Sequence, residues 1–168
     1  RSSAASDVYK RQLVVEPSFV CYKPLVEVSG GVAVPLVTKE EDHFRLTAAA
    51  LEAAITPKTK LLVFPYPNNP TCAVMRREDL EPICRVLQKH KIYVLSDEIY
   101  SELTYGGVDH TSIAAMPGMA ERTVVINGFS KTYSMTGWRL GYALGPAPII
   151  QQMTKLHQFA IMLSLIHI

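Results

Sequence analysis

Short apolar runs alternate with longer amphipathic segments along most of the chain. Continuous apolar runs, such as residues 60–64, favour strands that are covered on both faces, because a half-exposed strand would alternate apolar and polar residues. Residues 76–91 instead carry apolar side chains at the 3.6-residue period of an amphipathic helix. The members of this stripe are Leu80, Ile83, Cys84 and Leu87.

The same patterns predict the order of elements. Strands are expected at 13–15, 32–37, 60–64, 92–96, 123–126 and 139–144, and helices at 48–55, 76–91 and 146–157. Thr47 is expected to cap the first helix, and Pro35 places its strand near a sheet edge because proline cannot donate to the ladder. Strands alternating with helices predict an α/β fold, a three-layer sandwich with a mostly parallel sheet.

Composition limits the class of protein. The 168 residues are 48% hydrophobic and 19% charged, which favours one folded domain or part of a larger one. A net charge of +2 indicates no nucleic-acid or membrane partner, and no apolar run reaches the ~20 residues of a membrane span. Cys21, Cys72 and Cys84 lack paired spacing, which favours a reducing cytoplasm over a disulfide framework. The five histidines lack metal-ligand spacing, so we expect no metal.

Polar and aromatic clusters follow several of the predicted strands. Their candidate site residues are Phe19, Asn69, Asp97, Tyr100, Ser130, Lys131 and Arg139. Each alone has an ordinary explanation: a core ring for phenylalanine or tyrosine, a turn for asparagine, a helix cap for aspartate, and a loop or solvated surface for the others. Because ligands bind beyond the carboxyl ends of parallel strands, the shared position of Phe19, Asn69, Asp97 and Lys131 at such ends favours one common site.

Residues 127–142 (NGFSKTYSMTGWRLGY) resemble the lysine segment of the class I/II aminotransferases of fold type I, which depend on pyridoxal 5′-phosphate (PLP). Asp97 and Tyr100 resemble the D-x-x-Y pattern of that family, and Asn69, followed by Pro and Thr, resembles its N-P-T-G signature. The motifs keep the family's order over residues 13–162. The resemblance implies that this stretch is part of the PLP-binding large domain, which is incomplete here.

The resemblance also implies the cation chemistry of the site. Lys131 would form a Schiff base with the cofactor aldehyde and then act as general base and acid. Arg139 would bind the cofactor phosphate, since its fork of donors suits phosphate oxygens, and Ser130 would add a hydroxyl.

The remaining candidates would hold the cofactor ring. Asp97 would pair with the pyridine nitrogen and keep the ring an effective acceptor of electrons. Tyr100 and Asn69 would contact the phenolic oxygen, and Phe19 would stack on the ring face. Glu98 is expected to be a supporting or surface charge.

Two positions depart from the family pattern. Cys72 stands where glycine usually follows N-P-T, so the cysteine would be strained if the position requires φ > 0. Gly128 stands where many relatives carry a phosphate-binding serine. One phosphate hydroxyl would therefore be lost, which leaves Ser130 and Arg139 to bind the group.

Both ends of the chain lie outside the stretch that resembles the family and look foreign to it. Residues 1–12 and 163–168 are interpreted as non-native tails derived from sequencing adapters, so that 13–162 is an internal fragment of the large domain. The family's glycine-rich phosphate loop and its carboxylate-binding arginine are not found in the 168 residues. We therefore expect the fragment alone to bind PLP weakly and to be inactive or nearly so.

The intact enzyme is expected to be a cytoplasmic homodimer that transfers an amino group from an amino acid to a 2-oxo acid. Three alternatives stay open: a PLP-dependent lyase that eliminates across a C–S bond, a non-catalytic PLP-binding module, and a truncated inactive product. Release of pyruvate without an added oxo acid would favour the lyase. The identity of the substrates does not follow from these motifs.

Overall fold

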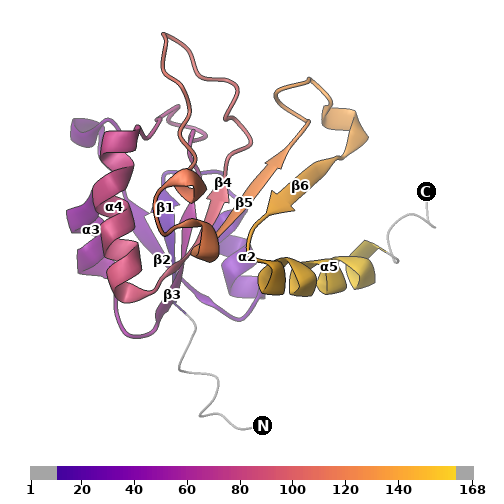
Figure 1. The fold of residues 1–168 in the computed structure, drawn as a ribbon, viewed down its shortest axis with the longest axis horizontal. Helices are drawn as coiled ribbons and strands as arrows, with labels where there is room; N and C mark the ends of the chain where they lie inside the picture. Colours follow the sequence, from indigo (N-terminus) through magenta and orange to yellow (C-terminus); the bar gives the residue numbers. More distant parts are fainter. Residues whose placement is uncertain (1–10, 162–168) are drawn as a thin grey trace, which may run out of the picture.

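Six short apolar segments pair into one sheet within residues 11–161, the part of the chain that the computed structural model describes (Figure 1). The strands are β1 (Arg11–Glu16), β2 (Val32–Val37), β3 (Thr59–Phe64), β4 (Tyr93–Asp97), β5 (Thr123–Gly128) and β6 (Gly141–Leu144). The helices are α2 (Tyr22–Val28), α3 (Ala48–Ala54), α4 (Arg77–His90) and α5 (Ala147–Ile161). The short 3₁₀ turns are η1 (Glu40–Asp42), η2 (Ile113–Ala115), η3 (Ala120–Arg122) and η4 (Thr136–Trp138).

The strand order is β2-β1-β3-β4-β5-β6, and every pair is parallel except β5 with β6. This mostly parallel sheet with helices confirms the predicted α/β class. Pro35 lies in β2, the outermost strand, which confirms the edge position predicted from its missing N–H group.

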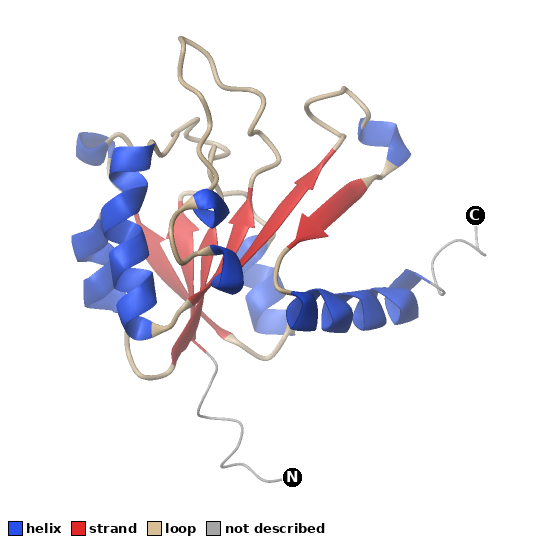
Figure 2. Cartoon of the chain, in the orientation of Figure 1, coloured by secondary structure: helices blue, strands red, loops and turns tan. Residues whose placement is uncertain are grey.

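The two faces of the sheet are covered very differently. On one face, α3 and α4 pack side by side and help to bury a cluster of 19 residues that includes Leu51, Leu80 and Ile83 (Figure 2). On the other face, α2 lies against β1 and β2, and the buried cluster contains only Val14, Val26 and Val63. Among the described residues, the main core therefore lies on the α3–α4 face.

The periodic segments fold as predicted, within a residue or two at their ends, except that α5 continues four residues beyond the end expected at residue 157. The stripe on α4 is buried along its whole length, at Leu80, Ile83, Cys84 and Leu87. The Thr47 hydroxyl accepts a hydrogen bond of 3.2 Å from the Ala50 N–H, which confirms the predicted cap of α3. The strand expected at 139–144 begins at Gly141, because Arg139 adopts a left-handed conformation with φ of 54°.

Two features of the N-terminal half were not predicted. Helix α2 has only seven residues and includes Pro24, so no helical period could emerge from its sequence. Strand β1 begins at Arg11 and takes in Gln12, which the interpretation of a non-native tail had included. A strand forms whatever the origin of its residues, so that origin stays a prediction. The rest of the proposed tails, residues 1–10 and 163–168, lies outside the described residues.

The connections between strands create a crevice at one end of the sheet. From β1 the chain passes to β2 on one side, then returns to place β3 on the other side of β1. Where successive connections leave a parallel sheet in opposite directions, the loops after the strands separate and leave room for a ligand. The segments that follow β1, β3, β4 and β5 therefore define the place to look for a site.

Candidate active site

All seven candidate residues line one cavity of about 390 Å³. They are Phe19, Asn69, Asp97, Tyr100, Ser130, Lys131 and Arg139. The volume lies within the usual range of small-molecule sites. Cys21, Tyr22 and Thr136 also line the cavity. Residues spread over 121 positions of sequence, from 19 to 139, therefore meet at the crevice predicted from the strand ends.

Asp97 is the last residue of β4 and is only partly buried. Its Oδ1 accepts a hydrogen bond of 3.1 Å from the Ile99 N–H, and its Oδ2 accepts one of 2.7 Å from the Tyr22 hydroxyl. Each carboxylate oxygen can accept a further donor. Asp97 is thus fixed from two sides and still presents acceptor capacity to the cavity.

Tyr22 is a site residue that the sequence did not reveal. It is the first residue of α2 and lies 75 positions before Asp97. Burial raises the pKa of its phenol far above the usual value, and the hydrogen bond to Asp97 raises it further. The phenol therefore stays protonated and can only donate to the carboxylate. No local pattern marks such a long-range pair.

Tyr100 and Asn69 meet at the same side of the cavity. The Asn69 Nδ2 group donates a long hydrogen bond of 3.4 Å to the Tyr100 hydroxyl. The Lys131 Nζ atom lies 5.8 Å from the centre of the Tyr100 ring, at the limit of a cation–π contact. A tyrosine hydroxyl, an amide and an amine are therefore close enough to act on one small molecule.

Arg139 reaches the cavity from an unusual backbone position. Its φ of 54° lies in the left-handed region, which costs a non-glycine residue free energy and recurs at functional sites. Its Nη1 group donates to the Thr136 carbonyl oxygen at 2.9 Å, which turns the side chain back over η4. Arg139 and Lys131 are both solvent-exposed, so the cavity has two cations on its open side.

Phe19 lies in the segment between β1 and α2 and is 51% exposed. The ordinary fate of phenylalanine is burial in a core, and that alternative does not hold here. An apolar ring left open on a cavity wall instead offers a flat surface for a ligand ring. Ser130 precedes Lys131 in the segment after β5 and is only partly buried.

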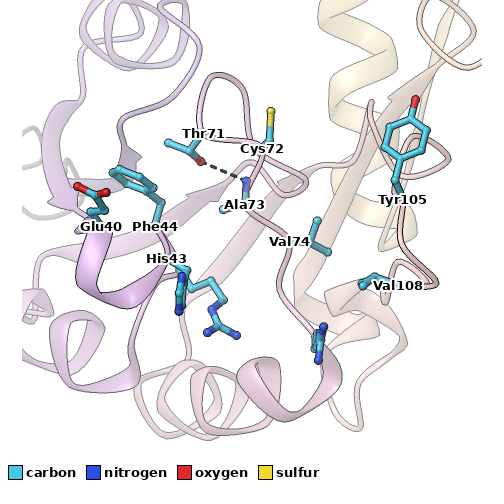
Figure 3. Close-up of a pocket in the computed structure, with 11 residues that line it drawn as sticks. Glu40, His43, Phe44, Thr71, Cys72, Ala73, Val74, Tyr105 and Val108 are labelled. Carbon is cyan, nitrogen blue, oxygen red and sulfur yellow. Dashed lines mark hydrogen bonds between the residues drawn. The ribbon is translucent and has the colours of Figure 1, made fainter.

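The loop after β3 supports Asn69 through its neighbours. The Asn68 side-chain oxygen accepts hydrogen bonds from the N–H and the hydroxyl of Thr71, at 3.2 and 3.0 Å. Cys72 has a φ of 59°, which is the positive φ at which a cysteine, unlike the family's glycine, is strained. Figure 3 shows this loop at the edge of a neighbouring hollow of about 590 Å³, which Thr71, Cys72 and Ala73 help to line. The Thr71 hydroxyl accepts a hydrogen bond from the Ala73 N–H. None of the seven candidates lines that hollow.

Glu98 follows Asp97 but points to the opposite face of the sheet. It is only 4% exposed, so of the two expected positions, a supporting charge or a surface charge, the surface position is wrong. Its Oε1 accepts from the hydroxyls of Ser96 and Ser112, at 2.9 and 2.8 Å, and its Oε2 lies 2.9 Å from His110 Nε2. Because a carboxylate oxygen accepts, the His110 Nε2 atom carries the proton of this bond.

Within residues 11–161, no helix is long and apolar enough to cross a lipid bilayer. Within the same residues, no three His, Cys, Asp or Glu side chains gather as metal ligands would.

Comparison with known proteins decides the family. The sequence model of the aminotransferase class I and II family matches residues 8–166. The chain belongs to this family. Aromatic-amino-acid aminotransferase 2 of Thermococcus litoralis is 45% identical over 147 residues, which make up 88% of this chain and 38% of that protein. These matches confirm the resemblance that the lysine segment indicated.

Solved structures of aminotransferases share the fold. An aromatic aminotransferase from Pyrococcus horikoshii OT3 has a TM-score of 0.87 at 44% identity and covers 90% of this chain. The aspartate aminotransferase of Thermus thermophilus with maleate has a TM-score of 0.83 at 41% identity and covers 89%. The matched part is 40% of the first of these chains and 38% of the second. The chain therefore spans about two-fifths of the length of these relatives.

Proposed function

We propose that this chain carries the cofactor site of a PLP-dependent aminotransferase, which transfers an amino group from an amino acid to a 2-oxo acid. The observation that carries the proposal is the single cavity lined by Lys131, Asp97 and Arg139 together with four neutral candidates. Membership of the aminotransferase family supports the reaction class. The substrates belong to the proposal, because relatives named for aromatic amino acids and for aspartate match the chain about equally well.

The chemistry of the cavity fits PLP. The cofactor has an aldehyde, a ring nitrogen, a phenolic oxygen, a phosphate and a flat apolar ring. The cavity offers an amine, a carboxylate, a guanidinium group with hydroxyls, and the open ring of Phe19. A cation for the phosphate and an anion for the ring nitrogen thus lie in one cavity. When bound, PLP supplies an electron sink for the negative charge that develops at the α-carbon of the substrate.

Lys131 would hold the cofactor through its amine and later carry the proton at the substrate α-carbon. Both roles use the neutral amine as nucleophile and as base. Arg139 lines the same cavity as Lys131. Arg139 and Ser130 would bind the phosphate, since the guanidinium fork stays charged at any working pH.

Asp97 would accept a hydrogen bond from the ring nitrogen with the capacity that Tyr22 and Ile99 leave free. Tyr100 and Asn69, which already bond to each other, would donate to the phenolic oxygen. Phe19 would cover one face of the ring. These assignments use every group that the sequence singled out.

The oligomeric state of the complete enzyme and the incompleteness of the 168 residues belong to the same proposal. Trp138, Tyr133 and Leu144 are 70%, 63% and 58% exposed, so the region around the lysine segment leaves apolar surface open. Exposed apolar surface of this kind favours association, which supports a homodimer for the complete enzyme. The exposed thiol of Cys72 suits a reducing cytoplasm. We propose that the 168 residues alone are a fragment that transaminates poorly or not at all.

An assay of the complete protein tests the function. The protein is incubated with PLP, a panel of aromatic and acidic amino acids, and 2-oxoglutarate as acceptor. We expect product only when both donor and acceptor are present, and a loss of at least ~100-fold in Lys131→Ala, the lower range for a general acid–base group. Release of pyruvate and sulfide from cysteine without an oxo acid would contradict transamination and indicate the lyase.

A further inference from the structure

The hydrogen bond between Tyr22 and Asp97 joins two parts of the cavity wall. Tyr22 begins α2, directly after the segment that carries Phe19 and Cys21, and Asp97 ends β4. At 2.7 Å the bond is short, as expected for a hydroxyl that donates to a carboxylate oxygen. Within the described residues, the other donor to this carboxylate is the Ile99 N–H, at 3.1 Å on the opposite oxygen.

The direction of this bond cannot reverse at working pH. Burial, and then the hydrogen bond with Asp97, raise the pKa of the Tyr22 phenol far above its usual value. Burial also raises the pKa of the neighbouring Cys21 thiol, and the negative charge of Asp97 contributes to that shift. At the start of α2, the neutral Tyr22 hydroxyl therefore donates to the negatively charged Asp97 carboxylate.

We propose that Tyr22 is a positioning residue, which holds the Asp97 carboxylate toward the cavity so that it meets the ring nitrogen of the bound cofactor. The Tyr22 hydroxyl occupies one lone pair of Oδ2, and the Ile99 N–H occupies one of Oδ1, which leaves one direction on each oxygen for the cofactor. This inference rests on the proposed function, because it concerns how the site meets PLP.

The same hydrogen bond could instead serve only as a structural tie, which holds α2 to β4 without orienting the Asp97 carboxylate. The two roles differ in one measurable respect. An orienting residue affects the interaction with the ring nitrogen selectively, whereas a tie affects the binding of every ligand of the same shape equally.

The test compares two ligands and two proteins. The ligands are PLP and its analogue with a C–H group in place of the ring nitrogen, and the proteins are the wild-type chain and Tyr22→Phe. NMR titration of the ¹⁵N-labelled chain measures dissociation constants even in the millimolar range. We expect the wild-type chain to bind PLP at least ~10-fold more tightly than the analogue, the strength of a charged hydrogen bond.

In Tyr22→Phe this preference is expected to fall by about three- to tenfold, while the affinity for the analogue stays within about twofold. Phenylalanine keeps the ring packing, so the variant removes one oxygen atom only. Tyr93→Phe is the matched control: it removes the same atom from an exposed tyrosine on β4, the strand that carries Asp97. This control is expected to leave both affinities unchanged.

The outcomes separate the inference from the proposed function. If Tyr22→Phe weakens both ligands equally, or leaves the preference intact, Tyr22 is a structural tie and the inference is wrong. If the wild-type chain does not prefer PLP, Asp97 does not meet the ring nitrogen, and the proposed cofactor geometry fails with it.

Discussion

The two faces of the sheet diverge most sharply at the end of β4, where two consecutive carboxylates point in opposite directions. Glu98 lies on the α3–α4 face, is 4% exposed, and is bonded by Ser96, Ser112 and His110. Asp97 lies on the α2 side, is half-buried, and borders the cavity with capacity to accept another donor. The same chemical group thus serves as internal support on one face and as a binding group on the other.

This difference follows from how each face is covered. The α3–α4 face contains 19 buried residues in one cluster, whereas the cluster under α2 has three. A buried carboxylate needs hydrogen-bond partners inside the protein, and both oxygens of Glu98 have them. On the thinly covered face, a carboxylate can keep capacity for a ligand. Stability and binding are therefore expected to respond to different residues.

Removal of the Glu98 carboxylate is expected to have the largest effect. Glu98→Ala leaves the hydroxyls of Ser96 and Ser112 and the His110 N–H without an acceptor, and should lower the free energy of unfolding by about 3–5 kcal/mol. Urea unfolding followed by circular dichroism measures it. Glu98→Gln, which keeps one acceptor oxygen, should recover more than half of the loss. Equal losses in both variants would mean that one acceptor oxygen of the right shape is not enough, and that the charge of the carboxylate is what Glu98 supplies.

Alkaline pH should lower the free energy of unfolding through Cys84, which is buried on the same face. Burial raises the pKa of the Cys84 thiol to about 11, from an ordinary value of 9.0 that we take for the unfolded chain. The folded state keeps this proton up to pH 11 and the unfolded state loses it from pH 9, so stability is full below pH 9 and falls as pH rises. Two pKa units correspond to at most ~3 kcal/mol. The free energy of unfolding measured at pH 8, 9, 10 and 11 should show this fall, and Cys84→Ala should flatten it between pH 9 and 10.

Asp97→Asn should separate binding from stability. The substitution removes the charge that the ring nitrogen would meet, so the affinity for PLP should fall by about 10- to 100-fold. The free energy of unfolding should fall by only about 1 kcal/mol, since one of two donors loses its acceptor. NMR titration and urea unfolding of the same sample measure both. A loss of stability as large as that of Glu98→Ala would break the contrast between the faces.

The smallest effect is expected at Cys72, in the loop beside the site. Glycine adopts φ of 59° without strain but is more flexible when unfolded, so Cys72→Gly should stabilise the chain by less than ~1 kcal/mol. Thermal unfolding measures the change. Cys72→Ala, which keeps a Cβ atom, is the control and should not stabilise. A gain in the alanine variant would locate the strain in the thiol rather than in the backbone.

Features with a local signal could be predicted from the sequence. The stripe of α4 and the cap at Thr47 obey short-range rules, and both are present. The shared position of Phe19, Asn69, Asp97 and Lys131 followed from a second rule, that parallel strands end at one edge, whereas Tyr100, Ser130 and Arg139 followed from the family resemblance; the cavity contains all seven. Their chemical roles are a separate matter and stay a proposal.

Features that depend on distant partners could not be predicted. Tyr22 is 75 positions from Asp97, and its short helix shows no period. Glutamate is rarely buried, and Glu98 is buried only because His110 and Ser112 return to it 12 and 14 residues later. Arg139 was placed in a strand because its neighbours are apolar, while its left-handed backbone depends on the turn before β6.

Borohydride trapping shows whether Lys131 holds PLP in this cavity. The protein is incubated with PLP, reduced with borohydride, digested and mapped by mass spectrometry. We expect one phosphopyridoxyl group on the peptide that contains Lys131, and none on that peptide in Lys131→Arg or after competition with an excess of pyridoxamine 5′-phosphate. Label spread over surface lysines such as Lys23 and Lys155, with Lys131 unmodified, would contradict it.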